Sequence, residues 1–146
     1  PIRKFDIRLA YRFHDIRTTY ENTLRQKPLN AKHRAFINLA YTTRSKWSVD
    51  YTVQWTGPKR IPSTAFNPSA YQLPQTSPSF ITMNAQISKA FPNLELYAGV
   101  ENITNIMQQN PIIQSNNPFG TYFDASLVWG PAMGRTIYGG LRFHKK

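Results

Sequence analysis

The sequence predicts an all-β protein, with about seven antiparallel strands that form one arc of a transmembrane β-barrel. Three observations lead to this fold class. Apolar and polar residues alternate along seven stretches, the apolar side of each stretch is almost free of charge, and aromatic residues lie near the stretch ends on that apolar side. No stretch repeats its apolar residues at the 3.6-residue period of an amphipathic helix.

The seven expected strands follow one another at intervals typical of hairpins. They cover residues 5–13, 35–42, 47–56, 81–88, 94–101, 122–129 and 136–143. Their apolar sides, taken at every second position, run from Phe5 to Phe13, Ala35 to Tyr41, Trp47 to Trp55, Ile81 to Ile87, Leu94 to Val100, Phe123 to Trp129 and Ile137 to Phe143. The third strand alternates most regularly, and the second carries one exception, Phe36, on its polar side.

The segments between these strands have turn chemistry. Residues 43–45, 92–93 and 130–134 are short enough for hairpin turns. The connections near 21–33, 57–78 and 104–120 are longer. Residues 61–78 are rich in Pro, Ser and Asn, which favours a loop.

Composition narrows the classes of function. The absence of cysteine excludes disulfides and thiolate metal sites. The net charge of +11 makes nucleic acid a candidate partner. However, the basic residues lie mainly at segment ends and not on one face, which favours binding to an anionic membrane surface instead. These end residues are Arg3, Lys4, Arg25, Lys27, Lys32, Arg34, Arg44, Lys46, Lys59, Arg60, Lys145 and Lys146.

Catalytic chemistry has no basis in the sequence. The three histidines, His14, His33 and His144, are scattered over three segments and do not predict a shared metal site. No paired carboxylates and no Ser-His-Asp arrangement occur at a useful spacing. We therefore expect no enzyme activity and no cofactor.

Strand length and strand count favour a segment of a larger membrane sheet. Nine or ten residues rising about 3.3 Å each and tilted near 45° climb roughly 23 Å, close to the roughly 25 Å apolar band of outer-membrane barrels. Seven strands with two open edges are not viable in a bilayer. Because the chain also begins with Pro1, we expect residues 1–146 to be an incomplete domain from a mature or truncated product.

Several motifs resemble the C-terminal part of the barrel of TonB-dependent outer-membrane receptors. Residues 94–105 are similar to the family's strand that ends in an Asn-Leu-Phe/Thr-Asp/Asn signature. Gly134-Arg135 begins a last strand that alternates up to the aromatic Phe143, as in the family. Residues 28–35 and 51–62 resemble a connection and a strand that precede them there, so the resemblance covers nearly the whole chain.

The resemblance implies a barrel of about 22 strands with a plug in its lumen. This chain would supply about the last third of that barrel, without the plug and without the N-terminal box that contacts the TonB-type energy-transducing complex. The implied activity is energy-coupled binding and import of a scarce nutrient such as a siderophore, haem, cobalamin, a metal or a glycan. The implied surroundings are the outer membrane of a Gram-negative bacterium, with lipid and lipopolysaccharide outside and the rest of the barrel and the plug inside.

Candidate site residues follow from the alternation. Side chains expected to face the lumen, where they would contact the plug or a ligand or line a wet channel, are Arg8, Arg12, Asp50, Glu95, Glu101, Asp124 and Arg142. Aromatic residues expected at the lipid interface are Trp47, Trp55, Trp129 and Phe143. Glu95 and Glu101 are candidates to pair with Arg142 or another basic side chain.

Orientation and function class leave alternatives open. Counting seven strands back from a periplasmic C-terminus puts the three long connections on the periplasmic side, against the usual rule of short periplasmic turns; we favour the count. A passive pore would share every strand feature. A soluble lipocalin-like carrier would instead turn the Trp47–Trp55 face inward around a small apolar ligand.

Overall fold

The computed structural model describes residues 5–144, and the predicted end charges Arg3, Lys4, Lys145 and Lys146 lie outside that range. The described chain is all-β, with about half of its residues in strands and no α-helix. The strands are β1 (Phe5–Phe13), β2 (Arg17–Tyr20), β3 (Thr23–Gln26), β4 (His33–Thr42), β5 (Trp47–Thr56), β6 (Phe80–Ala90), β7 (Leu94–Glu101) and β8 (Thr136–Phe143), with a single 3₁₀ turn, η1 (Ser69–Tyr71). Over these residues no helix has the length and apolar character to cross a membrane.

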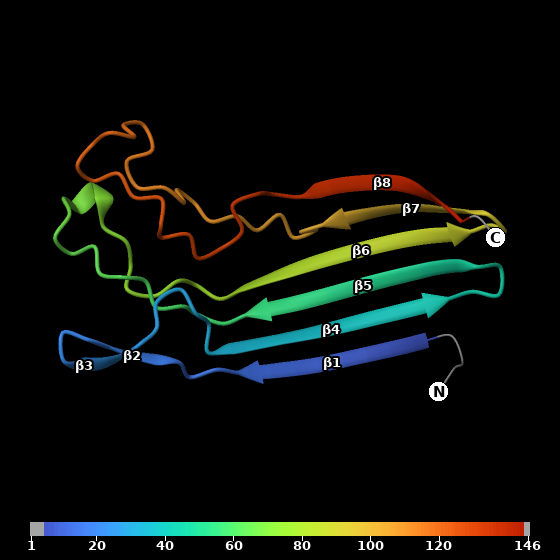
Figure 1. Cartoon of the computed structure of the whole chain (residues 1–146), viewed down its shortest axis with the longest axis horizontal. Coiled ribbons are helices and arrows are strands. Elements are labelled where there is room, and N and C mark those ends of the chain that lie inside the picture. Colours follow the sequence, from blue (N-terminus) through green and yellow to red (C-terminus); the bar gives the residue numbers. More distant parts are fainter. Residues whose placement is uncertain (1–4, 145–146) are drawn as a thin grey trace.

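Six strands form one antiparallel sheet in the order β1-β4-β5-β6-β7-β8, and β2 and β3 form a separate hairpin. Short turns join β4 to β5 and β6 to β7 at the end of the sheet where β1 begins and β8 ends (Figure 1). All the long connections lie at the opposite end. We call these connections, residues 14–32, 57–79 and 102–135, the loop layer.

Cross-strand register gathers the predicted apolar sides onto one face. Ile37 of β4 lies opposite Val53 of β5, which lies opposite Met83 of β6. The same face continues through Val100 of β7 and Ile137 of β8. Six of the seven predicted strands are therefore confirmed, with the predicted alternation.

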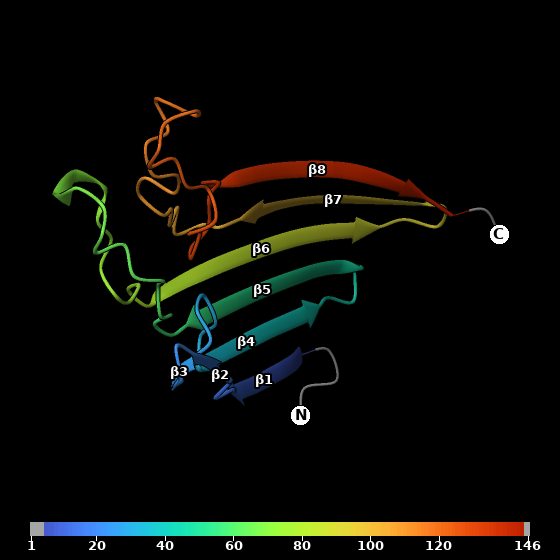
Figure 2. The ribbon, with the colours of Figure 1, turned by 60° about the vertical axis from the view of Figure 1, so that its left-hand side comes forward.

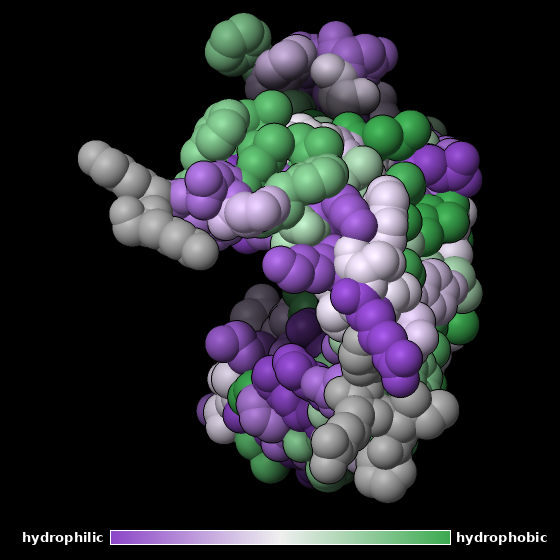
Figure 3. All heavy atoms as spheres, turned by 90° about the vertical axis from the view of Figure 1, so that its right-hand side faces the viewer, coloured by the Kyte–Doolittle hydropathy of each residue, from purple (hydrophilic) through white to green (hydrophobic). Residues whose placement is uncertain are grey.

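The sheet is strongly curved (Figure 2), as expected from the right-handed twist of β-strands. Seen from the end that carries the short turns, it forms a crescent whose hollow holds hydrophilic side chains, while hydrophobic ones follow the outer rim (Figure 3). Open hollows on this inner face are lined by polar-side residues such as Arg8, Asn38 and Thr52. The polar face is thus concave and the apolar face convex.

The predicted strand at 122–129 is wrong, because its backbone groups are bonded within the loop layer instead of along a sheet. Asp124 makes an isolated bridge to Ile113, and its carboxylate accepts the backbone N–H of Ser126. Gln108 accepts the N–H groups of Trp129 and Gly130. The alternation in this stretch arises from a loop that buries Leu127, not from a strand.

The predicted 21–33 connection contains part of a hairpin that the sequence reading missed. Strands β2 and β3 pair through a two-residue turn in which Glu21 and Asn22 have positive φ angles of 48° and 56°. Two successive residues at positive φ are typical of the type I′ turn, which matches the twist of the flanking strands. Because this hairpin is polar and exposed on nearly all its residues, it leaves no apolar alternation to detect.

Burial is concentrated in the loop layer and not in the sheet. The buried apolar residues are Ala31, Ile61, Ile113 and Leu127, all in connections. By contrast, Leu9 on β1 is 71% exposed and Ile137 on β8 is 77% exposed. The described sheet therefore has no hydrophobic core of its own.

Candidate functional site

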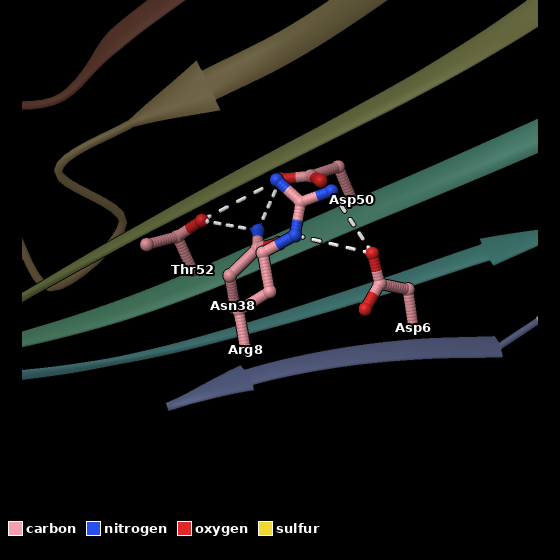
Figure 4. Close-up of polar contacts among 5 residues, drawn as sticks. All are labelled: Asp6, Arg8, Asn38, Asp50 and Thr52. Carbon is pink, nitrogen blue, oxygen red and sulfur yellow. Dashed lines mark hydrogen bonds and ion pairs between the residues drawn. The ribbon is translucent and has the colours of Figure 1, made fainter. Parts of the chain in front are cut away.

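The concave face carries two groups of polar contacts, one within β1 and one that joins β4 to β5 (Figure 4). The Arg8 guanidinium donates to the Asp6 carboxylate at 2.9 Å, two residues away on the same strand. The Asn38 amide donates at 2.9 Å both to the Asp50 carboxylate and to the Thr52 hydroxyl on the neighbouring strand. Arg8 and Asp50, two of the predicted inward residues, thus lie on the concave face, and each has a hydrogen-bond partner there.

The predicted pairing of Arg142 holds for one glutamate only. Arg142 lies opposite Glu95 in the β7–β8 ladder, and its guanidinium donates to that carboxylate at 2.9 Å. Glu101 lies opposite Thr136 at the other end of β7, so the register keeps it away from Arg142. Because the Arg142 side chain is mostly exposed, this ion pair contributes only about 0–1 kcal/mol.

Two tyrosines cover two glycines across the β7–β8 pair. Gly99 lies opposite Tyr138 and Gly140 lies opposite Tyr97. A methyl group added to Gly140 would lie 2.5 Å from the Tyr97 hydroxyl oxygen, so glycine is what leaves room for the ring. The Tyr138 hydroxyl then donates to the Gln86 side chain at 3.0 Å, which ties the last strand to β6.

Arginines from β1 and β4 meet near the loop end of the concave face. Arg12, a predicted inward residue, lies directly opposite Arg34 in the ladder. Both line an open hollow of about 350 Å³ together with Ala10, Ala35, Phe36, Gln54, Trp55 and Thr56. None of these lining residues is acidic.

The predicted interface aromatics do not all lie on strands. Trp47 and Trp55 occupy the two ends of β5 on the apolar face, and Phe143 ends β8 with 73% of its surface exposed. Trp129 is not at a strand end: it lies in the loop layer, where its ring packs against Phe80 and its carbonyl accepts the Lys59 ammonium. Asp124, predicted to face the lumen from a strand, lies in the same connection.

The segment 57–62, Gly-Pro-Lys-Arg-Ile-Pro, joins all three long connections, and we call it the hub. Arg60 accepts the Leu29 N–H at 2.8 Å and donates to the Gln26 carbonyl at 2.9 Å. Lys59 accepts the Ser77 N–H at 2.8 Å. The Lys59 ammonium also donates to the Trp129 carbonyl, which lies in the third connection, residues 102–135.

The surroundings of Lys59 in the hub change the pKa of its ammonium group. The pKa of Lys59 is lowered, first because partial burial removes water from the ammonium and second because Arg34 is nearby. Two contacts offset this cost, the Trp129 carbonyl and the face of the Phe80 ring, 5.6 Å from the nitrogen. Lys59 therefore links the second long connection to the third and is not a free surface charge.

Two buried amides fold the longest connection. The Asn102 side chain donates to the carbonyls of Ile106 and Met133 and accepts from the Ile106 N–H and the Thr104 hydroxyl. The Gln108 side chain donates to the Leu127 carbonyl as well as accepting from Trp129 and Gly130. Sequence reading did not single out Gln108, and the one local signal at Asn102 was its place in an Asn-rich motif.

Two phenylalanines of the loop layer are almost fully exposed. Phe66 is 98% exposed and Phe119 is 100% exposed. Between these connections the rings of Tyr71 and Tyr122 stack with centroids 5.6 Å apart, and Tyr71 lines an adjacent open hollow of about 290 Å³. No charged residue lines this hollow. Its polar groups include the side-chain amides of Gln72, Asn110, Gln114 and Asn116, and aliphatic side chains make up most of the remainder.

Comparison with known proteins adds no family. No family model, curated protein or solved structure matches the chain. Within residues 5–144 no group of three or more His, Asp or Glu side chains is placed to hold a metal ion.

Sequence reasoning missed the concave-face partners that depend on pairing. Arg34 was recognised only as one of the end charges, and Asn38 and Thr52 only as members of polar sides. Alternation places each of these residues on a face. Which residue lies opposite which is decided by strand register, and a single sequence carries little information on it.

Proposed function

We propose that this chain forms wall strands of an outer-membrane β-barrel receptor of the TonB-dependent kind, which imports a scarce nutrient. One observation carries the proposal: the convex face is apolar and the concave face is polar. A barrel that stands in lipid needs its apolar side chains outside and its polar ones toward the lumen. A lipocalin-like carrier needs the opposite arrangement, with the apolar face on the concave side.

The size of the exposed apolar surface supports a lipid environment. The convex rows extend across all six strands and include exposed Leu9, Ile37, Ile87, Ile137 and Leu141. Soluble monomers rarely expose contiguous apolar patches beyond a few hundred Å². Contact with acyl chains would remove this surface from water at about 25 cal/mol per Å².

The two edges of the sheet support a larger barrel. Within residues 5–144, strand β1 pairs only with β4, and β8 pairs only with β7, so each has one row of backbone groups without a strand partner. In a bilayer each unpaired backbone group costs several kcal/mol, and closed barrels avoid that cost. Further strands of the same protein are the natural partners for both edges.

The orientation inferred from seven strands is revised. With the 122–129 segment in the loop layer, the described part of the chain has six long strands, and its long connections lie opposite the end of β8. A periplasmic C-terminus then puts the long connections outside and the two short turns inside. Strand count and the rule of short periplasmic turns now agree, which supports an outer, ligand-facing role for the loop layer.

The two motifs nearest the C-terminus lie side by side. The Arg135 N–H donates to the Asn105 side chain at 2.9 Å, and its guanidinium donates to the Ile103 carbonyl. These contacts join the segment just after β7 to the residue just before β8. The resemblance to TonB-dependent receptors thus rests on residues that have a structural role, which is to fix where the last strand begins.

Cysteine labelling tests the faces, because the chain has no cysteine of its own. The test uses the full-length protein in cells. Val53→Cys should react with a lipid-soluble thiol reagent, whereas the neighbouring Thr52→Cys should react with a water-soluble one. The reverse pattern at the two positions would support the lipocalin-like carrier.

Orientation has its own labelling pair. Gln72→Cys in the loop layer should react with a membrane-impermeant maleimide on intact cells, and Ser45→Cys in a short turn should react only after permeabilisation. A receptor should also lose uptake when the inner-membrane energy source is collapsed. Uptake that persists would point to a passive pore.

A further inference from the structure

Arg12 and Arg34 form a like-charge pair on the concave face. They are direct partners in the β1–β4 ladder, and both are exposed. The Cβ atoms of direct partners in such a ladder lie about 4.5–5.5 Å apart, and like charges at that spacing destabilise a sheet. An anion bound between the two guanidinium groups would offset this repulsion.

The described part of the chain supplies no such compensation. Arg8, Arg17 and Arg142 each contact a carboxylate at 2.8–2.9 Å. Within residues 5–144, Arg34 makes no ion pair and no side-chain hydrogen bond, and the Arg12 guanidinium donates only to His14 Nδ1 at 2.8 Å. The nearby Asp15 is already shared by Arg17 and Lys32.

The pair faces an open space of suitable chemistry. The hollow of about 350 Å³ that both arginines line contains no acid, and Gln54 and Thr56 add uncharged hydrogen-bonding groups. Lys59 adds a third positive charge close enough for the charge of Arg34 to lower its pKa. A small anionic group fits both the space and the charge.

We propose that Arg12 and Arg34 form an oxyanion site that binds a carboxylate or phosphate group. Planar guanidinium forks suit both groups because each can donate two parallel hydrogen bonds to them. The anion belongs either to the imported ligand or to an acidic side chain of the protein's own chain inside the hollow. The first of these two origins, the imported ligand, rests on the proposed function, under which the site lies toward the outer end of the lumen.

Calorimetric titration of the full-length protein in detergent tests the site, with citrate and inorganic phosphate as probes. With a ligand source, at least one probe binds, and Arg12→Gln and Arg34→Gln each weaken it about tenfold. Arg142→Gln is the matched control: it removes the same charge from the same face but already has Glu95 as a partner, so binding should stay within about twofold.

The charge reversal Arg34→Glu separates the two sources. With a ligand source, it abolishes probe binding and raises the thermal midpoint, because the introduced carboxylate can pair with Arg12. With an internal acid, neither probe binds the wild type, and Arg34→Glu lowers the midpoint. Equal probe binding in the wild type and both Gln variants overturns the site, as does absence of probe binding together with an unchanged or raised midpoint in Arg34→Glu. The Thr52 and Val53 labels involve neither arginine, so the proposed function stands or fails separately.

Discussion

The sheet and the loop layer are stabilised in different ways. Of the buried residues in the described range, only Ser88 and Gly99 lie on strands, and all others lie in the loop layer. The sheet is held by its backbone ladders and leaves both faces exposed, whereas the connections bury side chains and satisfy each other's backbone groups. Burial within the described residues therefore stabilises the loop layer and contributes little to the sheet.

Val53→Arg should have the largest effect, because it places a charge on the convex face near the middle of β5. On a lipid-facing strand such a charge costs about 2–4 kcal/mol of folding free energy in the bilayer. The measurement is reversible unfolding of the full-length protein in vesicles. Thr82→Arg on the polar face of β6 is the control and should cost less than about 1 kcal/mol; equal losses at the two positions would contradict a lipid-facing convex side opposite a wet concave side.

Asn102→Ala should loosen the loop layer and leave the sheet intact. The buried amide bonds four groups of its own connection, and its loss should cost about 2–3 kcal/mol of local stability. Hydrogen exchange should show faster opening of residues 102–135 and unchanged protection of β4 and β5. Asn110→Ala is the matched control, since both asparagines have positive φ but Asn110 is exposed. An equal response would assign the effect to backbone strain.

Gly140→Ala should displace the Tyr97 ring and weaken the β7–β8 pair by about 1–2 kcal/mol. Gly139→Ala on the same strand is the control, because its added methyl group would meet only ordinary contacts at 3.4 Å or more. Thermal unfolding and near-ultraviolet circular dichroism of the tyrosines would compare them. Matching losses would show that Tyr97 does not depend on glycine beneath it.

Acid should have the smallest effect and should act on the loop layer first. Hydrogen bonds from Arg17 and Lys32 lower the pKa of Asp15 from its ordinary 3.8. The stability from these contacts is therefore present above pH 3.8 and is lost as pH falls below it. Hydrogen exchange in the β2–β3 hairpin should rise in that window, and Asp15→Asn should remove the pH dependence.

Most of the sheet could be predicted from the sequence, because period-2 alternation is a local signal. It located β1, β5, β7 and β8 to within a residue at each end and assigned Arg8, Arg12, Asp50, Glu95 and Arg142 to one face. It failed at 122–129, where the same alternation arises from a loop that buries Leu127. Backbone groups there are satisfied by Gln108, about 20 residues away, and a local pattern does not contain that partner.

The loop layer and the arginine pair could not be predicted for the same reason. The hub binds Gln26, Leu29, Ser77 and Trp129, which are distant in sequence and are joined through backbone atoms that any residue supplies. The Arg12–Arg34 pair follows from register alone. Register is fixed by the fit of six apolar rows and the short turns, and no single strand contains that information.

The hub begins one residue after β5 ends, and its position is therefore set by the register of that strand. A one-residue slip of β5 would turn its apolar side into the hollow and would at the same time move Lys59 and Arg60 away from their partners in all three connections. Such a slip would cost folding free energy twice, once through misplaced side chains on the faces of the sheet and once through lost contacts in the loop layer. The register of β5 and the contacts of the loop layer are therefore coupled, so that each stabilises the correct arrangement of the other.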